Sequence, residues 1–144
     1  MWQMVYKYLV GTAGLTNMLW GWDVGGGSTG LSAWYPGDAY VDVVAIDNLS
    51  PPYPNASATY TELLTYNKPI FFASIGLSYN IPAAFSGNNY TTIVQPIIAH
   101  FPAVFGYAMW AQNLGLNEQN GAVQCLTGGP MLNRSNLPRF SRAR

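Results

Sequence analysis

The sequence predicts an α/β protein built around a parallel β-sheet. Four short apolar runs, rich in β-branched and aromatic residues, do not alternate with polar residues, which is typical of strands buried on both faces of a parallel sheet. The runs begin 23 to 34 residues apart, a spacing that suits strand–helix–strand units. Helical patterns lie between the runs, and this alternation favours α/β architecture.

The chain should begin with a helix that leads into the first strand. Residues 2–10 have a helical pattern, which we expect to end at Gly11 or Gly14 because glycine is common just after a helix. The apolar run 18–22 is the first expected strand. The glycine-rich stretch 25–30 is then a loop at the carboxyl end of that strand, where parallel α/β proteins place their sites.

Three more strands and two more helices complete the pattern. Amphipathic helices are expected at residues 59–67 and 90–101, and Pro96 should kink the second helix or mark its late start. The stretch 50–54 is a loop by composition and follows the second strand. The remaining strands are expected at residues 41–47, 69–74 and 103–110.

Composition excludes several classes of protein and site. Of the 144 residues, 49% are hydrophobic and 8% are charged, with a net charge of zero. Such a chain is expected to fold and to bind no nucleic acid, because it lacks a basic surface. It has no apolar run of the ~18 residues needed to cross a bilayer, so no membrane partner is expected. One Cys and one His exclude a disulfide framework and a multi-histidine metal site, so no metal or other cofactor is expected.

The charge distribution predicts one domain, residues 1–133, followed by a basic tail, residues 134–144. The tail holds four of the six basic residues, and we expect it to be disordered. The N-terminal residues do not have the pattern of a signal peptide. Four N-x-S/T sequons nevertheless favour a secreted glycoprotein. The asparagines that would accept the glycans are Asn48, Asn55, Asn89 and Asn133.

The single cysteine has two possible roles. Cys125 is either a small buried hydrophobe or half of a disulfide with a partner outside this chain.

Three motifs lie at the entrances to predicted strands: Leu15-Thr16-Asn17 with Trp20, then Tyr35-Pro36-Gly37-Asp38 before Tyr40-Val41-Asp42, and Asn67-Lys68-Pro69. Together with the later FGYAMWAQN, they resemble the C-terminal half of glycoside hydrolase family 26, the β-mannanase family. The resemblance covers about residues 5–115. It implies half of a (β/α)8 TIM-type barrel, namely strands five to eight with their helices, because such barrels need about 250 residues.

The resemblance implies a retaining glycoside hydrolase site, from which this chain departs. Retaining hydrolysis uses two carboxyl groups about 5–5.5 Å apart. The family's acid/base Glu lies on a strand that this chain does not include, and Ser74 stands at the position of the nucleophile Glu. A serine hydroxyl is a poor nucleophile without an adjacent base. The family's Tyr two residues after Asp47 is also replaced, by Leu49, so we expect an inactive site.

Aromatic and acidic residues near the strand ends are the candidate sugar contacts. They are Trp22, Tyr35, Asp47 and Trp110, of which Asp47 and Trp110 match family positions. Aromatic faces stack on the apolar faces of pyranose rings, and a carboxylate bonds sugar hydroxyls. The competing interpretations are core packing for the two tryptophans, a turn for Tyr35, and a structural acid for Asp47.

Three other acids have weaker candidate roles. Asp23, just past the first strand, could form a substitute carboxylate pair with Asp47. Glu118, in the polar stretch after the last strand, could supply displaced acid chemistry. Glu62 is expected on the outer face of a short helix, in contact with solvent.

Three functions remain open. The first is a catalytically inactive family 26-like fragment that binds a mannan-type polysaccharide. The second is a structural, self-assembling secreted glycoprotein, because a half-barrel leaves two strand edges that would pair with the missing barrel half or with further copies. The third is part of an active endo-β-mannanase whose N-terminal half is missing here.

Overall fold

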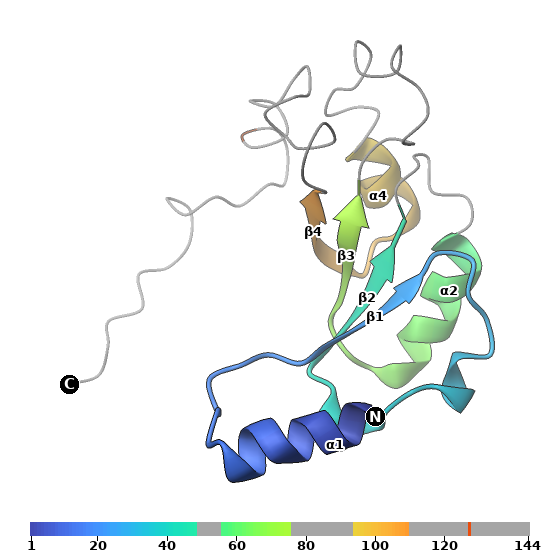
Figure 1. Ribbon diagram of the computed structural model, residues 1–144. Coiled ribbons are helices and arrows are strands. Elements are labelled where there is room, and N and C mark those ends of the chain that lie inside the picture. Colours follow the sequence, from blue (N-terminus) through green and yellow to red (C-terminus); the bar gives the residue numbers. More distant parts are fainter. Residues whose placement is uncertain (49–55, 76–93, 110–126, 128–144) are drawn as a thin grey trace, which may run out of the picture.

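A computed structural model describes residues 1–48, 56–75, 94–109 and 127. Its centre is a parallel sheet with the strand order β1-β2-β3-β4, so every strand pairs with its neighbour in the sequence (Figure 1). All four expected strands are present, and the prediction of a parallel α/β fold is confirmed. The strands are β1 (Gly21–Gly25), β2 (Val43–Asp47), β3 (Ile70–Ile75) and β4 (Val104–Met109).

The first strand begins at Gly21, later than the expected position 18. The reason is that Trp20 bonds to the segment entering β2 before regular pairing starts. Its N–H donates to the Asp42 carboxylate at 2.8 Å, and its carbonyl accepts from the N–H of Asp42 at 2.9 Å. Its ring packs against Trp2 and Tyr6 of the N-terminal helix, with centroids 5.9 and 4.9 Å away.

The helices lie close to their expected positions. Helix α1 (Trp2–Tyr6) continues as the π-helical segment η1 (Lys7–Thr12), and Gly14 follows with a φ of 69°. Helix α2 (Ala56–Leu63) is extended by a 3-10 turn, η4 (Leu64–Tyr66). Helix α4 (Gln95–His100) has Pro96 in its first turn, so the late start is the correct alternative. Two short 3-10 helices, η2 (Leu31–Ala33) and η3 (Asp38–Tyr40), connect β1 to β2.

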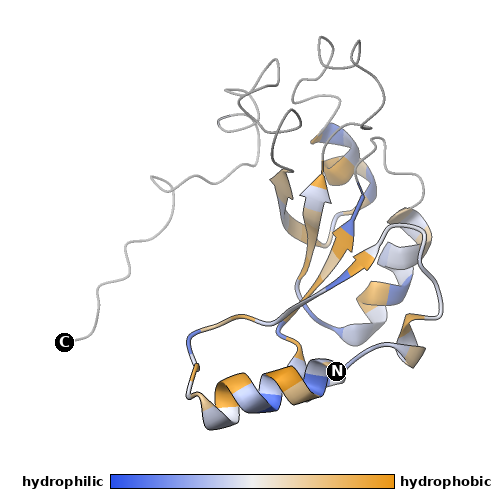
Figure 2. Ribbon diagram, in the orientation of Figure 1, coloured by the Kyte–Doolittle hydropathy of each residue, from blue (hydrophilic) through white to orange (hydrophobic). Residues whose placement is uncertain are grey.

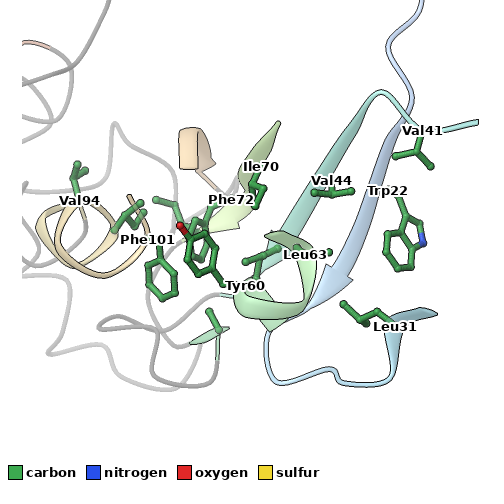
Figure 3. Packing of buried hydrophobic residues seen from close by; sticks show 14 residues of the cluster. Trp22, Leu31, Val41, Val44, Tyr60, Leu63, Ile70, Phe72, Val94 and Phe101 are labelled. Atoms are coloured by element: carbon green, nitrogen blue, oxygen red, sulfur yellow. The ribbon is translucent and has the colours of Figure 1, made fainter. Parts of the chain in front are cut away.

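The hydrophobic core lies between the sheet and helices α2 and α4 (Figures 1 and 3). Phe72 of β3 and Leu63 of α2 are fully buried there. The ring of Phe101, just after α4, meets Phe72 and Tyr60 edge to face, both at 5.2 Å between centroids. Tyr60 also accepts a hydrogen bond from the N–H of Ala103 at 2.9 Å, which ties α2 to the entrance of β4.

The opposite face of the sheet is more open. In β1 the buried Trp22 lies between the exposed residues Gly21 and Asp23, as expected where successive side chains point to opposite faces. Phe105 of β4 is 66% exposed. Strands β1 and β4 form the two edges of the described sheet. Figure 2 shows hydrophobic and hydrophilic residues alternating along the N-terminal helix, outside the main core.

No helix in the described part of the chain is long and apolar enough to cross a membrane.

Candidate functional site

Asp47 at the carboxyl end of β2 and Ser74 near that of β3 lie side by side at the carboxyl edge of the sheet, and Asp23 lies in the middle of β1, where its register partner is Ala45. Asp47 is the register partner of Gly25 on one side and of Ser74 on the other. Asp23 is two positions before Gly25, so the two acids lie on the same face of the sheet. An irregularity between Ile46 and Asp47 shifts the register, which is what aligns Ser74 with Asp47.

Ser74 is buried, with 5% of its surface exposed, and its Oγ has no hydrogen-bond partner among the described residues. The single histidine, His100, lies on α4, where its ring is near that of Phe101. A serine becomes a nucleophile when a base takes its proton. No described residue does this for Ser74, so the arrangement does not activate its hydroxyl.

Ser74→Ala is expected to raise the free energy of unfolding by about 1 kcal/mol, because it removes a buried hydroxyl that has no partner. Urea unfolding followed by circular dichroism measures the change. Thr59→Val is the matched control, since the Thr59 hydroxyl is also buried but makes two hydrogen bonds. The control should be destabilised by about 1–2 kcal/mol. A comparable loss in Ser74→Ala would show that its hydroxyl has a partner.

The negative charge of Asp47 affects the ionisation of Asp23. Partial burial of the carboxyl, followed by the negative charge of Asp47, raises the pKa of Asp23, and a hydrogen bond from the backbone of Val24 opposes this shift. A carboxyl group with a raised pKa beside a second carboxyl is the arrangement from which acid–base chemistry can be built. No cluster of metal-ligating side chains is found in the ranges that the structure describes.

Asp23→Asn is expected to stabilise the protein near pH 7, and the gain should shrink as the pH falls toward about 4. The folded-state pKa of Asp23 is raised above the unfolded value of 3.8, so its ionised form opposes folding. This opposition is complete above the folded pKa and disappears once the carboxyl is protonated in both states. Unfolding at several pH values measures the trend. As a control, Asp47→Asn should lower the pKa of Asp23 in a carboxyl NMR titration, and an unchanged titration would contradict the coupling.

The two aromatic candidates that the structure describes, Trp22 and Tyr35, pack against the hydrophobic core. Trp22 is 8% exposed, belongs to the core, and meets Tyr35 and Tyr66 edge to face at 5.2 and 6.0 Å. Tyr35 stacks on Tyr66 at 4.1 Å, and its hydroxyl donates to Asp38 at 2.7 Å. These positions favour core packing for Trp22, and the bond from Tyr35 to Asp38 lies within the Tyr-Pro-Gly-Asp segment that was expected to form a turn. Trp110 and Glu118 lie outside the described residues.

Sequence reasoning missed the role of Glu62, and its assignment to the solvated face was wrong. Its carboxylate accepts hydrogen bonds from the N–H groups of three loop residues, Gly30, Leu31 and Ser32. One turn earlier on α2, the Thr59 hydroxyl accepts from Gly27 at 2.9 Å and donates to the carbonyl of Ser28 at 3.0 Å. The i, i+3 spacing of Thr59 and Glu62, opposite a glycine-rich loop, was the available signal.

Comparison with known proteins identifies the family. Residues 1–102 match the profile described as Glycosyl hydrolase family 26. The chain belongs to glycoside hydrolase family 26. It is 28% identical over 138 residues to a mannan endo-1,4-beta-mannosidase of Bacillus subtilis, covering 95% of this chain and 37% of that protein. A mannan endo-1,4-beta-mannosidase A and B of Caldalkalibacillus mannanilyticus is 25% identical, over 94% of this chain and 26% of its own length.

Solved structures share the fold of this family 26 chain. The YdhT protein from Bacillus subtilis superposes with a TM-score of 0.78 at 23% identity, covering 92% of this chain and 38% of that one. The Bacillus subtilis mannanase man26 gives a TM-score of 0.75 at 21% identity, covering 97% of this chain and 41% of that one. This chain therefore spans well under half the length of these relatives.

One candidate glycosylation site of this family 26 chain lies next to the carboxyl edge. Asn48 is partly buried, and its N–H donates to the Ser74 carbonyl at 3.0 Å. Its side-chain amide lies so close to Gly26 that a Cβ there would be 2.6 Å from the amide nitrogen. The Asn48 side chain thus packs against the loop after β1. Asn55, Asn89 and Asn133 lie outside the described residues.

Proposed function

We propose that this chain is the second half, strands five to eight, of a family 26 barrel that contacts mannan-type polysaccharide without hydrolysing it. Two findings support the half-barrel assignment. The chain forms four parallel strands in sequence order, and it covers 38% and 41% of two superposed family structures. The named activity of the curated relatives, mannan endo-1,4-beta-mannosidase, supports mannan as the polysaccharide.

The main support for the proposed lack of hydrolysis is the position of Ser74. It is the penultimate residue of β3 and lies beside Asp47, where the family resemblance expects the nucleophile carboxylate, and its hydroxyl has no described base. Retaining hydrolysis requires one carboxyl group to attack and another to protonate the leaving oxygen. In the described part of the chain, the carboxyl groups nearest to Ser74 along the sheet are those of Asp47 at the end of β2 and Asp23 in the middle of β1. Both lie on strands other than the one that carries Ser74.

The ligand contacts belong to the same proposal. Asp47 would bond a sugar hydroxyl, with Trp110 as the aromatic partner because it directly follows β4 in the sequence. Trp22 and Tyr35 would support the site by packing beneath it rather than by stacking on sugar. A secreted location, with the sequons as glycan acceptors, suits a protein whose ligand is an extracellular polysaccharide.

The edges of the sheet support assembly as a second candidate function. Neither the outer edge of β1 nor that of β4 has a partner strand among the described residues. Open parallel edges favour pairing with another chain. The partner would be the missing barrel half or a second copy. Analytical ultracentrifugation separates these cases, and a monomer at high concentration would argue against self-assembly.

Binding and hydrolysis of a β-mannan, measured on the same samples, test the main proposal. Wild type should bind mannan and release no reducing sugar, and Asp47→Asn should weaken binding. Release of reducing sugar that is lost in both Ser74→Ala and Asp47→Asn would overturn the proposed inactivity. If the natural protein carries an upstream barrel half, Ser74→Glu in that longer chain should gain hydrolysis. If the longer chain is already active with Ser74 in place, the third interpretation, an active enzyme seen in part, is correct.

A further inference from the structure

A cleft with a volume of about 330 Å³ opens between β1 and the loop that follows it. Trp22 and Leu31 form its buried wall, and both are part of the core (Figure 3). Ser28, Thr29 and Trp34 line it from the loop and from the end of η2. The cleft lies on the opposite face of β1 from Asp23, because Trp22 and Asp23 are adjacent in the strand. It therefore opens on the other face of the sheet from the two acids, next to Gly25, the register partner of Asp47.

Side chains of helix α2 hold the backbone of the loop that forms the cleft. Glu62 binds three successive N–H groups at Gly30, Leu31 and Ser32, and Thr59 binds both Gly27 and Ser28. These contacts fix the backbone on both sides of Thr29 without using any side chain that lines the cleft. A site that is fixed before binding loses little conformational freedom when a ligand arrives. The loop thus has the rigidity of a binding surface.

The lining residues favour a neutral ligand that has both apolar faces and hydroxyl groups. Trp34 is 78% exposed, and no aromatic ring among the described residues packs against it. The hydroxyls of Ser28 and Thr29 make no side-chain hydrogen bond within the described chain. No charged side chain lines the cleft. An exposed indole beside two free hydroxyls fits a pyranose ring, which presents C–H groups on its faces and hydroxyls around its rim.

We propose that this cleft binds one hexopyranose unit of a polysaccharide, with Trp34 stacked on the ring and Ser28 and Thr29 bonded to its hydroxyls. The site is additional to the contacts assigned to Asp47. The residues that line the cleft support the binding of a pyranose ring. The choice of a mannan as the polysaccharide rests on the proposed function. A polysaccharide long enough to reach both the cleft and Asp47 would be bound on both faces of the sheet at β1 and β2.

Titration with mannohexaose, followed in the indole N–H region of the NMR spectrum, tests the site directly. The Trp34 signal, assigned with Trp34→Phe, should shift on binding. Trp34→Ala should weaken the affinity about tenfold, the upper range for one lost aromatic contact. Thr29→Val, which removes an exposed hydroxyl and keeps the shape, should weaken it about threefold. Phe105→Ala is the matched control, because Phe105 is another exposed aromatic, 66% exposed, on a different strand, and it should change the affinity less than twofold.

The outcomes separate this inference from the proposed function. Binding that is unchanged in Trp34→Ala but weakened in Asp47→Asn would overturn the cleft and leave the proposed function standing. Binding that depends on Trp34 and not on Asp47 would support the cleft and count against the assigned edge site. A Trp34 signal that does not move at saturating mannohexaose would overturn the cleft. So would protection of Trp34 from acrylamide quenching in a longer natural chain without sugar, because polypeptide would then cover the cleft.

Discussion

Phe72→Ala is expected to lower the free energy of unfolding by about 3–5 kcal/mol, the usual cost of removing a fully buried phenyl ring. Phe72 is 0% exposed, lies on the interior strand β3, and meets the ring of Phe101 at 5.2 Å. Its removal leaves a cavity between the sheet and α4, which backbone relaxation fills only in part. Small domains are stabilised by only about 5–15 kcal/mol in total, so much of the population should be unfolded at moderate urea concentrations.

Urea unfolding monitored by circular dichroism measures this loss. Phe105→Ala provides the control, because Phe105 is the same residue type on the neighbouring strand but is 66% exposed. We expect the control to lose less than about 1 kcal/mol. Equal losses in the two variants would show that the core between the sheet and α4 is not packed as described.

Glu62→Ala should produce the second-largest loss, about 2–3 kcal/mol, because three backbone N–H groups lose a charged acceptor together. Hydrogen bonds to charged groups are worth more than neutral ones, and part of this loop is shielded from water. Glu62→Gln should lose less, since one carbonyl oxygen remains as an acceptor. Its new NH₂ group cannot accept from the remaining N–H.

Two measurements distinguish the loss of the Glu62 hydrogen bonds from a general loss of packing. Asp42→Asn removes the charge from an exposed carboxylate that accepts one backbone N–H, from Trp20, so its loss should be only about 0.5 kcal/mol. Burial, followed by the negative charge of Glu62, raises the pKa of Tyr66. Glu62→Gln should therefore lower the Tyr66 pKa in an NMR titration. An unchanged Tyr66 titration, together with an unchanged stability, would show that Glu62 does not hold the loop through these hydrogen bonds.

The sheet could be predicted from the sequence because hydrophobic burial dominates its strands. Continuous apolar runs such as the one ending at Asp47 have few alternatives to a buried strand. Pro96 also located the start of α4, since proline favours the first turn of a helix. The first strand was placed too early because Trp20 is apolar yet packs on the N-terminal helix. Apolar character alone does not tell which partner a residue packs against.

The site was less predictable because it depends on long-range contacts. The resemblance aligned Ser74 with a catalytic position, but the register shift that brings it beside Asp47 appears only in the sheet. The Glu62 contacts join residues about thirty positions apart in the chain, and the spacing of Thr59 and Glu62 shows a shared helix face without showing which segment it binds. Trp22 could have been placed better, since it adjoins Asp23 and must point to the opposite face.

The sequential strand order has a consequence for how the protein emerges from the ribosome. Each strand pairs with the one synthesised immediately before it, so no strand has to wait for a distant segment of the chain. Each parallel pairing still has to close a crossover through a helix, which is slower than forming a hairpin, but it involves only consecutive strands. The sheet can therefore grow in the direction of translation, with each helix–strand unit adding to a template already in place. In a longer natural chain, a strand of an upstream β/α unit would be formed first, and β1 would pair with it.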